Sequence, residues 1–343
     1  MADPAPRGGE PRAHRLLGLA RAAVRVLTSL PARIVITAGL LTLIAMKIDW
    51  DAVGDAVSGA GWGWFVLAVL AVVASFVIGA VRWSWLLAAA DVAAARARSL
   101  RAYFIGAFAN NLLPTGFGGD LVRAVIVAEP GPPLARSLTS VLVDRLSSLG
   151  CLVLVGWIGV ALDPDAVPSR LVGLLAIVSA IAAAGAAVAV VLLRRGRIGR
   201  FLPERLRPWA SEVARVLRDY LADRALLARV VLAGVSLQAM VVVALWLLAR
   251  TIGVSLPLAL LSVVMPLVLI ATLAPVTVGG FGIREGAFVA LLGEVGVSSG
   301  EATVISLLSV AAMAIASLPG GLALVIGTGR AGSAGQPGEA ALR

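Results

Sequence analysis

The chain has 343 residues, of which 60% are hydrophobic and only 14% are charged, and its mean hydropathy is +0.98. Long apolar runs recur along the whole sequence and cannot all be buried in one soluble core, so the composition excludes an ordinary soluble domain in favour of a polytopic membrane protein. The net charge of +10 is concentrated in a few loops, which indicates contact with anionic lipid headgroups before nucleic acid.

The N-terminal region, residues 1–33, contains six arginines and no signal-peptide cleavage site, so we expect a retained cytoplasmic tail. A short apolar run at 34–48 predicts the first membrane span. The second predicted span, 62–81, has tryptophans at one end and Arg82 with Trp83 at the other. Because aromatic residues favour both interfaces and arginine favours the cytoplasmic side, we expect Arg82 and Trp83 at the cytoplasmic interface.

Four further full spans are predicted at 137–162, 171–193, 230–249 and 302–327, and a short cytoplasmic tail, 328–343, follows them. Only helices or closed barrels satisfy the backbone within lipid, and apolar runs of this length are typical of helices. The expected fold class is an all-α polytopic membrane protein with about six full spans.

Two other apolar segments are interrupted by proline and paired glycines. They share the pattern P-x-x-x-G-G-x-x-x-R, formed by Pro114, Gly118, Gly119 and Arg123 in the first segment and by Pro275, Gly279, Gly280 and Arg284 in the second. Such residues free backbone groups that lipid cannot satisfy, so the breaks must be buried in protein or line a wet cavity. Transporters bind their cargo at breaks of this kind, and the recurrence indicates an internal repeat.

The distribution of arginine predicts how these broken segments meet the membrane. The loop 194–229 holds ten arginines and should be cytoplasmic, which requires that residues 102–128 enter and leave the membrane on the same side. By the same reasoning the second break, within 257–297, enters from the external side. We therefore expect two inverted re-entrant hairpins that point into the bilayer from opposite faces.

The cytoplasmic loop 194–229 contains its own helical pattern. From Pro208, which suits a first helical position, apolar residues up to Leu221 fall at three- and four-residue spacings with charged residues between them. The pattern predicts an amphipathic basic helix. Two interpretations are open: the helix rests in the cytoplasmic leaflet and gathers anionic lipids, or it caps the underside of the bundle.

These motifs resemble the flippase-like transmembrane domain of the lysylphosphatidylglycerol synthase family. The resemblance covers roughly residues 30–328 and rests on Asn110, Asn111, Pro114, Gly118, Gly119, Asp120 and Arg123, followed by Pro275, Gly279, Gly280, Gly282, Arg284, Glu285 and Gly286. It implies that residues 34–327 form a domain that moves an aminoacylated or otherwise modified phospholipid between leaflets. Bifunctional members of the family carry a soluble aminoacyl transferase domain after the membrane part. Only 328–343 follows here, so we expect a stand-alone member that does not synthesise lysylphosphatidylglycerol.

The motif residues suggest how a phosphate group would be held. Asp120 is a suitable N-cap for a helix starting at Leu121, whose N-terminal N–H groups would attract an anion. The planar guanidinium group of Arg123 suits a phosphodiester. The alternative is that Asp120 and Arg123 form a structural ion pair, and Arg284 with Glu285 has the same two interpretations.

Asp144 and Arg145 add a second candidate site, because both lie on the order of 10 Å inside the span that starts near residue 137. Arg145 can snorkel toward the interface. Asp144 is expected to hold a headgroup amine or to pair with Arg123 across the bundle, whereas Asn110 and Asn111 are expected to hydrogen-bond loose backbone at the hairpin.

Two other classes of function remain open. The pairs Asp49/Asp51 and Asp163/Asp165 lie in predicted external loops, where polyprenyl-dependent glycosyltransferases place catalytic or metal-binding acids. An Ala/Gly-rich stretch at 179–191 would suit a non-transporting scaffold. The sequence has no P-loop or recognisable catalytic constellation, and its lone Cys151 and His14 offer no metal site, so we expect a lipid transporter of the cell membrane without a cofactor. Its expected partners are membrane phospholipids, a separate lipid-modifying enzyme and further copies of the chain, with no nucleic acid.

Overall fold

The structure, a computed structural model, describes residues 42, 46, 54, 58–92, 96–112, 118–128, 134–194, 207–273, 277 and 280–333. Every regular element in these ranges is a helix, as the sequence predicts. The helices are α4 Trp62–Ala89, α5 Arg96–Leu112, α6 Gly118–Ala128, α7 Leu134–Leu162, the short 3-10 helix η1 Pro164–Ala166, α8 Ser169–Arg194, α9 Arg207–Ala222, α10 Arg224–Thr251, α11 Leu258–Thr272, α12 Ile283–Gly293 and α13 Ser299–Ser333.

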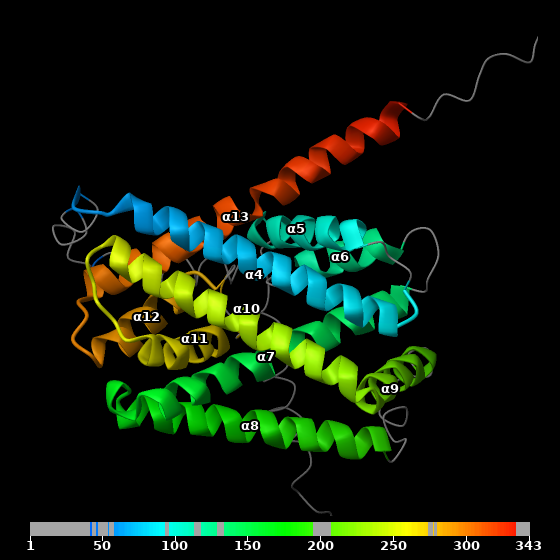
Figure 1. Cartoon of the computed structure of the whole chain (residues 1–343), viewed down its shortest axis with the longest axis horizontal. Coiled ribbons are helices and arrows are strands. Elements are labelled where there is room, and N and C mark those ends of the chain that lie inside the picture. Colours follow the sequence, from blue (N-terminus) through cyan, green and yellow to red (C-terminus); the bar gives the residue numbers. More distant parts are fainter. Residues whose placement is uncertain are drawn as a thin grey trace, which may run out of the picture.

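Five of the described helices, α4, α7, α8, α10 and α13, are long and apolar enough to cross a membrane. Four of them, α4, α7, α8 and α10, extend along the long axis of the molecule (Figure 1). The prediction of an all-α multi-pass membrane protein is therefore confirmed. The N-terminal tail, 1–33, and the first of the six predicted spans, 34–48, except residues 42 and 46, lie outside the described residues.

Helices α4 and α10 form the centre of the bundle and run antiparallel. At one end the Gly61 amide donates to the Thr251 carbonyl at 2.8 Å. Further along, Ala68 and Ala71 on α4 are buried in one cluster with residues of α10 that include Ala244. Small side chains allow the two helix backbones to approach closely, which is how helices associate in an apolar solvent.

Helices α5 and α6 form the first re-entrant pair. Asn110 Oδ1 accepts a hydrogen bond from the Gly119 amide near the turn, and Arg98 donates to the Ile126 carbonyl at the open end, so the two helices are antiparallel. A Cβ atom added at Gly119 would lie only 1.9 Å from the Gly106 carbonyl oxygen. The crossing therefore requires glycine at 119.

Helices α11 and α12 form the second re-entrant pair. Between them Gly280 and Gly282 have φ angles of 78° and 85°, which glycine adopts without steric cost. Figure 1 shows that α5 and α6 enter the bundle from the end where α9 lies, whereas α11 and α12 enter from the opposite end. The inverted arrangement of the two hairpins was predicted from the sequence.

Helix α9 lies across one end of the bundle and buries its apolar face there. Val216 and Tyr220 belong to the same buried cluster as Trp83 and Leu86 of α4, and the Tyr220 hydroxyl donates to the Leu86 carbonyl. Of the two interpretations of this amphipathic helix, the structure supports packing against the bundle. Leu221 nevertheless remains exposed.

Helix α4 is longer than the predicted span. It continues past residue 81 to Ala89, and Arg82 and Trp83 are almost completely buried inside the protein. The physical reason is that Arg82 is neutralised by a carboxylate inside the protein, so it does not need the water at the interface.

Candidate functional site

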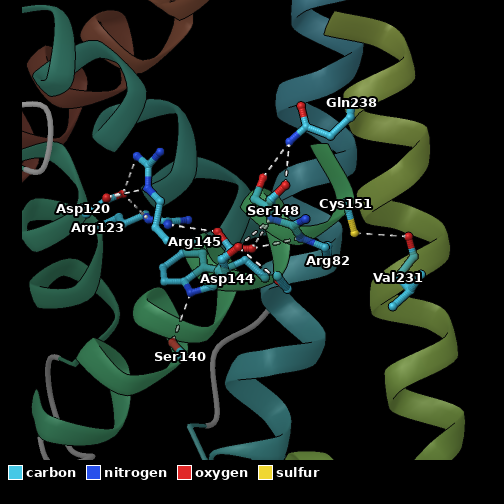
Figure 2. Close-up of polar contacts among 12 residues, drawn as sticks. Arg82, Asp120, Arg123, Ser140, Asp144, Arg145, Ser148, Cys151, Val231 and Gln238 are labelled. Carbon is cyan, nitrogen blue, oxygen red and sulfur yellow. Dashed lines mark hydrogen bonds and ion pairs between the residues drawn. The ribbon is translucent and has the colours of Figure 1, made fainter. Parts of the chain in front are cut away.

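Five charged side chains from three helices form one continuous chain of hydrogen bonds inside the bundle (Figure 2). Arg82 comes from α4, Asp120 and Arg123 from the first turns of α6, and Asp144 and Arg145 from α7. We call these five residues the charge network. It joins a long central helix, a re-entrant helix and a second long helix.

Asp144 is the centre of the charge network. Its Oδ1 accepts from Arg82 Nη2 at 2.6 Å and from Arg82 Nε at 3.0 Å, and its Oδ2 accepts from Arg123 Nη2 at 3.0 Å. Arg82 also donates to the backbone carbonyl of Asp144 at 3.1 Å. Both carboxylate oxygens are thus engaged by guanidinium groups from two different helices.

Asp120 links the other two arginines. Its Oδ1 accepts from Arg123 Nε at 3.1 Å and from Arg145 Nη2 at 3.0 Å, and its Oδ2 accepts from Arg145 Nε at 2.7 Å. The Arg145 contact is a bidentate fork, the geometry that gives arginine–carboxylate pairs their strength and direction.

The charge network is buried and carries a net positive charge. Three guanidinium groups face two carboxylates, which leaves one positive charge. The side chains of Arg82, Arg123, Asp120 and Asp144 are at most 9% exposed, whereas that of Arg145 is 45% exposed. Arg145 is therefore the member through which the network meets its surroundings.

Aromatic rings hold Arg123 in place. Its guanidinium carbon lies 4.7 Å from the Trp83 ring centroid and 4.9 Å from the Tyr103 ring centroid. Trp83 is itself fixed by a 3.1 Å hydrogen bond from its indole N–H to Ser140. Cation–π contacts of this kind are worth about 2 kcal/mol when desolvated, so the orientation of Arg123 is strongly defined.

Two guanidinium nitrogens in the charge network have no hydrogen-bond partner among the described residues. Arg82 Nη1 and Arg123 Nη1 are both buried, and neither contacts an acceptor there. Among the polar groups of the neighbouring helices, Gln238 Nε2 donates to the Ser148 hydroxyl at 2.9 Å and to its carbonyl at 3.0 Å. Buried donors without acceptors are unfavourable, so these two nitrogens offer capacity for an anionic or polar ligand.

The sequence identified four of the five network members. The expected pairing of Asp144 with Arg123 is confirmed, and the i, i+3 pair of Asp120 with Arg123 is present as well. The expectation that Asp120 is an N-cap is wrong, because α6 already begins at Gly118 and the carboxylate is turned toward two arginines. Arg82 was missed, although the apolar sequence that continues after it was a signal that the helix does not end there.

The polar residues before the first break have separate roles. Asn110 accepts from the Gly119 backbone at 2.8 Å, as expected. Asn111 donates to the Ser317 hydroxyl on α13 at 2.9 Å instead of to loose backbone. Gly118 is the first residue of α6, and Pro114 lies outside the described residues.

In the second hairpin, the described residues include a buried carboxylate with its own partners. Glu285 is buried; its Oε2 accepts from the Gly282 amide and its Oε1 accepts from the Ser306 hydroxyl at 3.3 Å. The Arg284 guanidinium carbon lies 5.7 Å from the Phe281 ring centroid. Pro275 and Gly279 lie outside the described residues, and Gly280 provides a left-handed turn.

Within the described part of the chain, no three His, Cys, Asp or Glu side chains are grouped as metal ligands. Asp163 and Asp165 lie in and beside η1 at the surface, and Asp49 and Asp51 lie outside the described residues. The charge network is accordingly the main concentration of buried charge that the described helices contain.

The sequence matches the family described as lysylphosphatidylglycerol synthase TM region over residues 31–321, which is most of the chain. No curated protein matches it.

Proposed function

Because this chain belongs to the lysylphosphatidylglycerol synthase transmembrane family, we propose that it moves an anionic or aminoacylated phospholipid, or another lipid-linked headgroup, between the leaflets of the cell membrane. Family membership by itself gives a membrane protein with a lipid-related function. The observation that carries the more specific proposal is the buried charge network, which has a net positive charge and reaches the surface at Arg145.

Burying five charged side chains among membrane-spanning helices costs free energy, which indicates that the charge network is kept for a function. Ionisable residues within membrane spans are rare, and they usually mark the pathway of a substrate or ion. A buried ion pair gains little stability over an apolar pair of similar size, so stability alone is a weak reason to keep five charged residues there. A lipid phosphate that crosses the apolar layer needs compensating cations along its route, and the three arginines supply them.

The arrangement of the two hairpins supports transport for a separate reason. Broken helices that enter from opposite sides form the cargo sites of many transporters, and rocking of one half against the other gives alternating access. Here α6 begins inside the bundle, and Asp120 and Arg123 lie in its first two turns. Motion of the α5–α6 pair would therefore move two of the five charges relative to Asp144.

The proposal includes an orientation. Arginine-rich segments favour the cytoplasmic side, so we place α9 and both termini there. In this orientation the first hairpin opens to the cytoplasm and the second to the outside (Figure 1). The partners are then phospholipids of both leaflets, together with an enzyme that modifies them; the proposal assigns no catalytic step to this chain.

The test is leaflet exchange of fluorescent phospholipids in proteoliposomes that contain the full chain. Wild-type protein should accelerate exchange over protein-free vesicles. Arg123→Lys keeps the charge but loses the planar fork, and exchange should fall by about tenfold or more, since one charge-assisted hydrogen bond is worth about 1.5–3 kcal/mol. Thermal stability in detergent is measured in parallel to separate lost transport from lost folding.

The matched control is Arg170→Gln. Arg170 forms an ion pair with Glu294 at the other end of the molecule, and its side chain is 74% exposed. This variant should transport lipid like the wild type. If no labelled lipid exchanged faster than in protein-free vesicles, the transport proposal would be contradicted. A stable Arg123→Lys protein that kept an accelerated wild-type rate would instead show that the charge network does not hold the transported lipid.

A further inference from the structure

We infer that the charge network recognises the phosphate of a net-anionic phospholipid and disfavours a headgroup that carries an added ammonium. This inference rests on the proposed transport function and narrows it, because the family name alone points to an aminoacylated lipid.

Both oxygens of each buried carboxylate already accept hydrogen bonds, and the two carboxylates of the charge network are neutralised by guanidinium groups. Asp144 is held by Arg82 and Arg123, and Asp120 is held by Arg123 and Arg145. Glu285, in the other hairpin, already accepts from a backbone amide and a serine hydroxyl. Binding of an ammonium by Asp144 would displace Arg82 or Arg123 from its carboxylate, and Arg82 has no other carboxylate partner among the described residues.

The charge network does, by contrast, have guanidinium N–H groups that are available to donate to a ligand. Arg82 Nη1 and Arg123 Nη1 are buried without an acceptor among the described residues. Arg145 engages Asp120 through Nε and Nη2, and its Nη1 has no hydrogen bond to another described residue, so it is available to a ligand. The local surplus is therefore one positive charge and several N–H groups, which is the complement of a phosphodiester oxygen pair.

The surface around Arg145 fits the rest of a lipid. Leu142 and Leu146 on α7 are 41% and 55% exposed, and Leu121 and Val125 on the adjacent α6 are 53% and 39% exposed. A half-exposed guanidinium among outward apolar side chains can pair with a phosphate while the acyl chains lie against the leucines. A soluble anion would gain nothing from this apolar surface.

The excess positive charge of the network favours anionic headgroups over headgroups that carry an added ammonium. A bound phosphodiester neutralises the single excess positive charge, whereas a headgroup with an additional ammonium brings a like charge close to three guanidinium groups. In a medium of low dielectric constant, such attraction and repulsion are much larger than in water. Anionic lipid should therefore bind more tightly than zwitterionic lipid, and lysyl-modified lipid should bind most weakly.

The experiment measures the thermal unfolding midpoint of the detergent-purified full chain while short-chain lipids are titrated. Phosphatidylglycerol should raise the midpoint at a concentration about tenfold lower than lysylphosphatidylglycerol, with phosphatidylcholine between them. Equal or greater potency of lysylphosphatidylglycerol would overturn the inference. Inorganic phosphate should have no effect at these concentrations; if it matched phosphatidylglycerol, the site would be one for a free oxyanion and the lipid assignment would be wrong.

Variants of Arg145 test whether this residue is responsible for the stabilisation by phosphatidylglycerol. Arg145→Gln should weaken the response to phosphatidylglycerol by about tenfold, because it removes the charge and the fork, and Arg145→Lys should recover only part of it. Arg170→Gln, an exposed arginine at the other end of the bundle, should respond like the wild type. An unchanged response in a folded Arg145→Gln protein would overturn the assignment of the site.

The two proposals fail in different ways. Charge-selective binding without any leaflet exchange would leave the recognition inference standing and refute transport. Leaflet exchange at equal rates for phosphatidylglycerol and lysylphosphatidylglycerol, with equal binding of both, would leave transport standing and refute the selectivity.

Discussion

At the scale of single residues, Asp144 connects the parts of the charge network that are furthest apart in the sequence. Its carboxylate lies between Arg82, 62 positions earlier, and Arg123, 21 positions earlier. Removing one member of a buried ion pair leaves an uncompensated charge, whereas removing both members together leaves a polar but neutral interior. This asymmetry separates the structural contribution of the network from any role in binding.

Asp144→Asn should destabilise the protein by about 3–5 kcal/mol, because two buried guanidinium groups lose their shared counter-charge. Adding Arg82→Gln to Asp144→Asn should restore part of this stability, since one of the unpaired charges is then gone. Thermal unfolding in detergent measures both. If the double variant were less stable than Asp144→Asn alone, the pairing of Arg82 with Asp144 would not be the main interaction of either residue.

A surface pair provides the control. Glu294→Gln leaves Arg170 without its partner, but both side chains are accessible to solvent and the expected change is only about 0–1 kcal/mol.

Whether the sequence predicts a residue of the site depends on the position of that charged residue within its apolar segment. Asp144 and Arg145 stand out because they lie well inside an apolar run, and Asp120 and Arg123 stand out because they follow a helix break. Arg82 lies at a point where an ordinary span of about 20 residues would end, so the positive-inside rule explains it equally well as an interface residue. Only its contact with Asp144 distinguishes the two cases.

At the scale of helices, the repeated P-x-x-x-G-G-x-x-x-R pattern does not produce the same local structure twice. Gly119 is helical and lies against Gly106, whereas Gly280 turns the chain with a positive φ before α12 begins. The pattern thus predicts that a break occurs in each segment and leaves its geometry open. The difference arises because close backbone approach and a left-handed turn both favour glycine.

Gly119→Ala should disrupt the α5–α6 crossing, since the new methyl group would lie 1.9 Å from the Gly106 carbonyl oxygen. We expect a loss of at least about 1–3 kcal/mol in thermal unfolding measurements, as is typical of overpacking. Gly150→Ala on α7 is the matched control, because a Cβ there meets nothing within 4 Å. Equal stability of the two variants would show that the helices separate easily and that the crossing is not tight.

Helix α9 is an element whose existence was clear from periodicity but whose docking was not. Its apolar spacing fits a membrane surface as well as a protein surface, and the hydrogen bond from Tyr220 to the Leu86 carbonyl identifies the protein surface. Burial, followed by the negative charge of Asp144, raises the pKa of the Tyr220 hydroxyl. The hydroxyl therefore stays protonated and donating above the pH at which a free tyrosine ionises.

Tyr220→Phe should lower stability by about 1 kcal/mol at neutral pH through loss of this hydrogen bond. Because the pKa of the folded protein is raised, the contribution of Tyr220 is fully present below the unfolded pKa of about 10 and is lost as the pH rises toward the folded value. The stability difference between wild type and Tyr220→Phe should hence be constant from pH 7 to about 9 and shrink at higher pH. A difference that grew with alkaline pH would contradict the assigned hydrogen bond.

At the scale of the whole molecule, α13 connects the two hairpins. Ser306 on α13 donates to Glu285 of the second hairpin, and Ser317 accepts from Asn111 of the first. Beyond Ser317, Gly320 allows the backbone of α5 to approach so closely that an added Cβ would lie 2.0 Å from the Phe104 carbonyl oxygen. Hydropathy predicts that α13 spans the membrane, but contacts between elements far apart in the chain leave no periodic trace in the sequence.

The orientation of the bundle decides which hairpin opens to which side, and cysteine labelling measures it. In a Cys151→Ala background, Ser169→Cys at the start of α8 should react with an impermeant thiol reagent in intact cells. Asp219→Cys on α9, which lies at the opposite end of the bundle (Figure 1), should react only after permeabilisation, because arginine-rich segments stay in the cytoplasm.

Both substituted positions are exposed, so the comparison reports sidedness and not burial. Labelling of Asp219→Cys from outside would reverse the orientation. The α5–α6 pair and the charge network would then open to the external side, and the lipid that Arg145 meets first would come from the outer leaflet. The expected pattern instead gives Arg145 access to phospholipids from the cytoplasmic leaflet, where anionic headgroups are abundant.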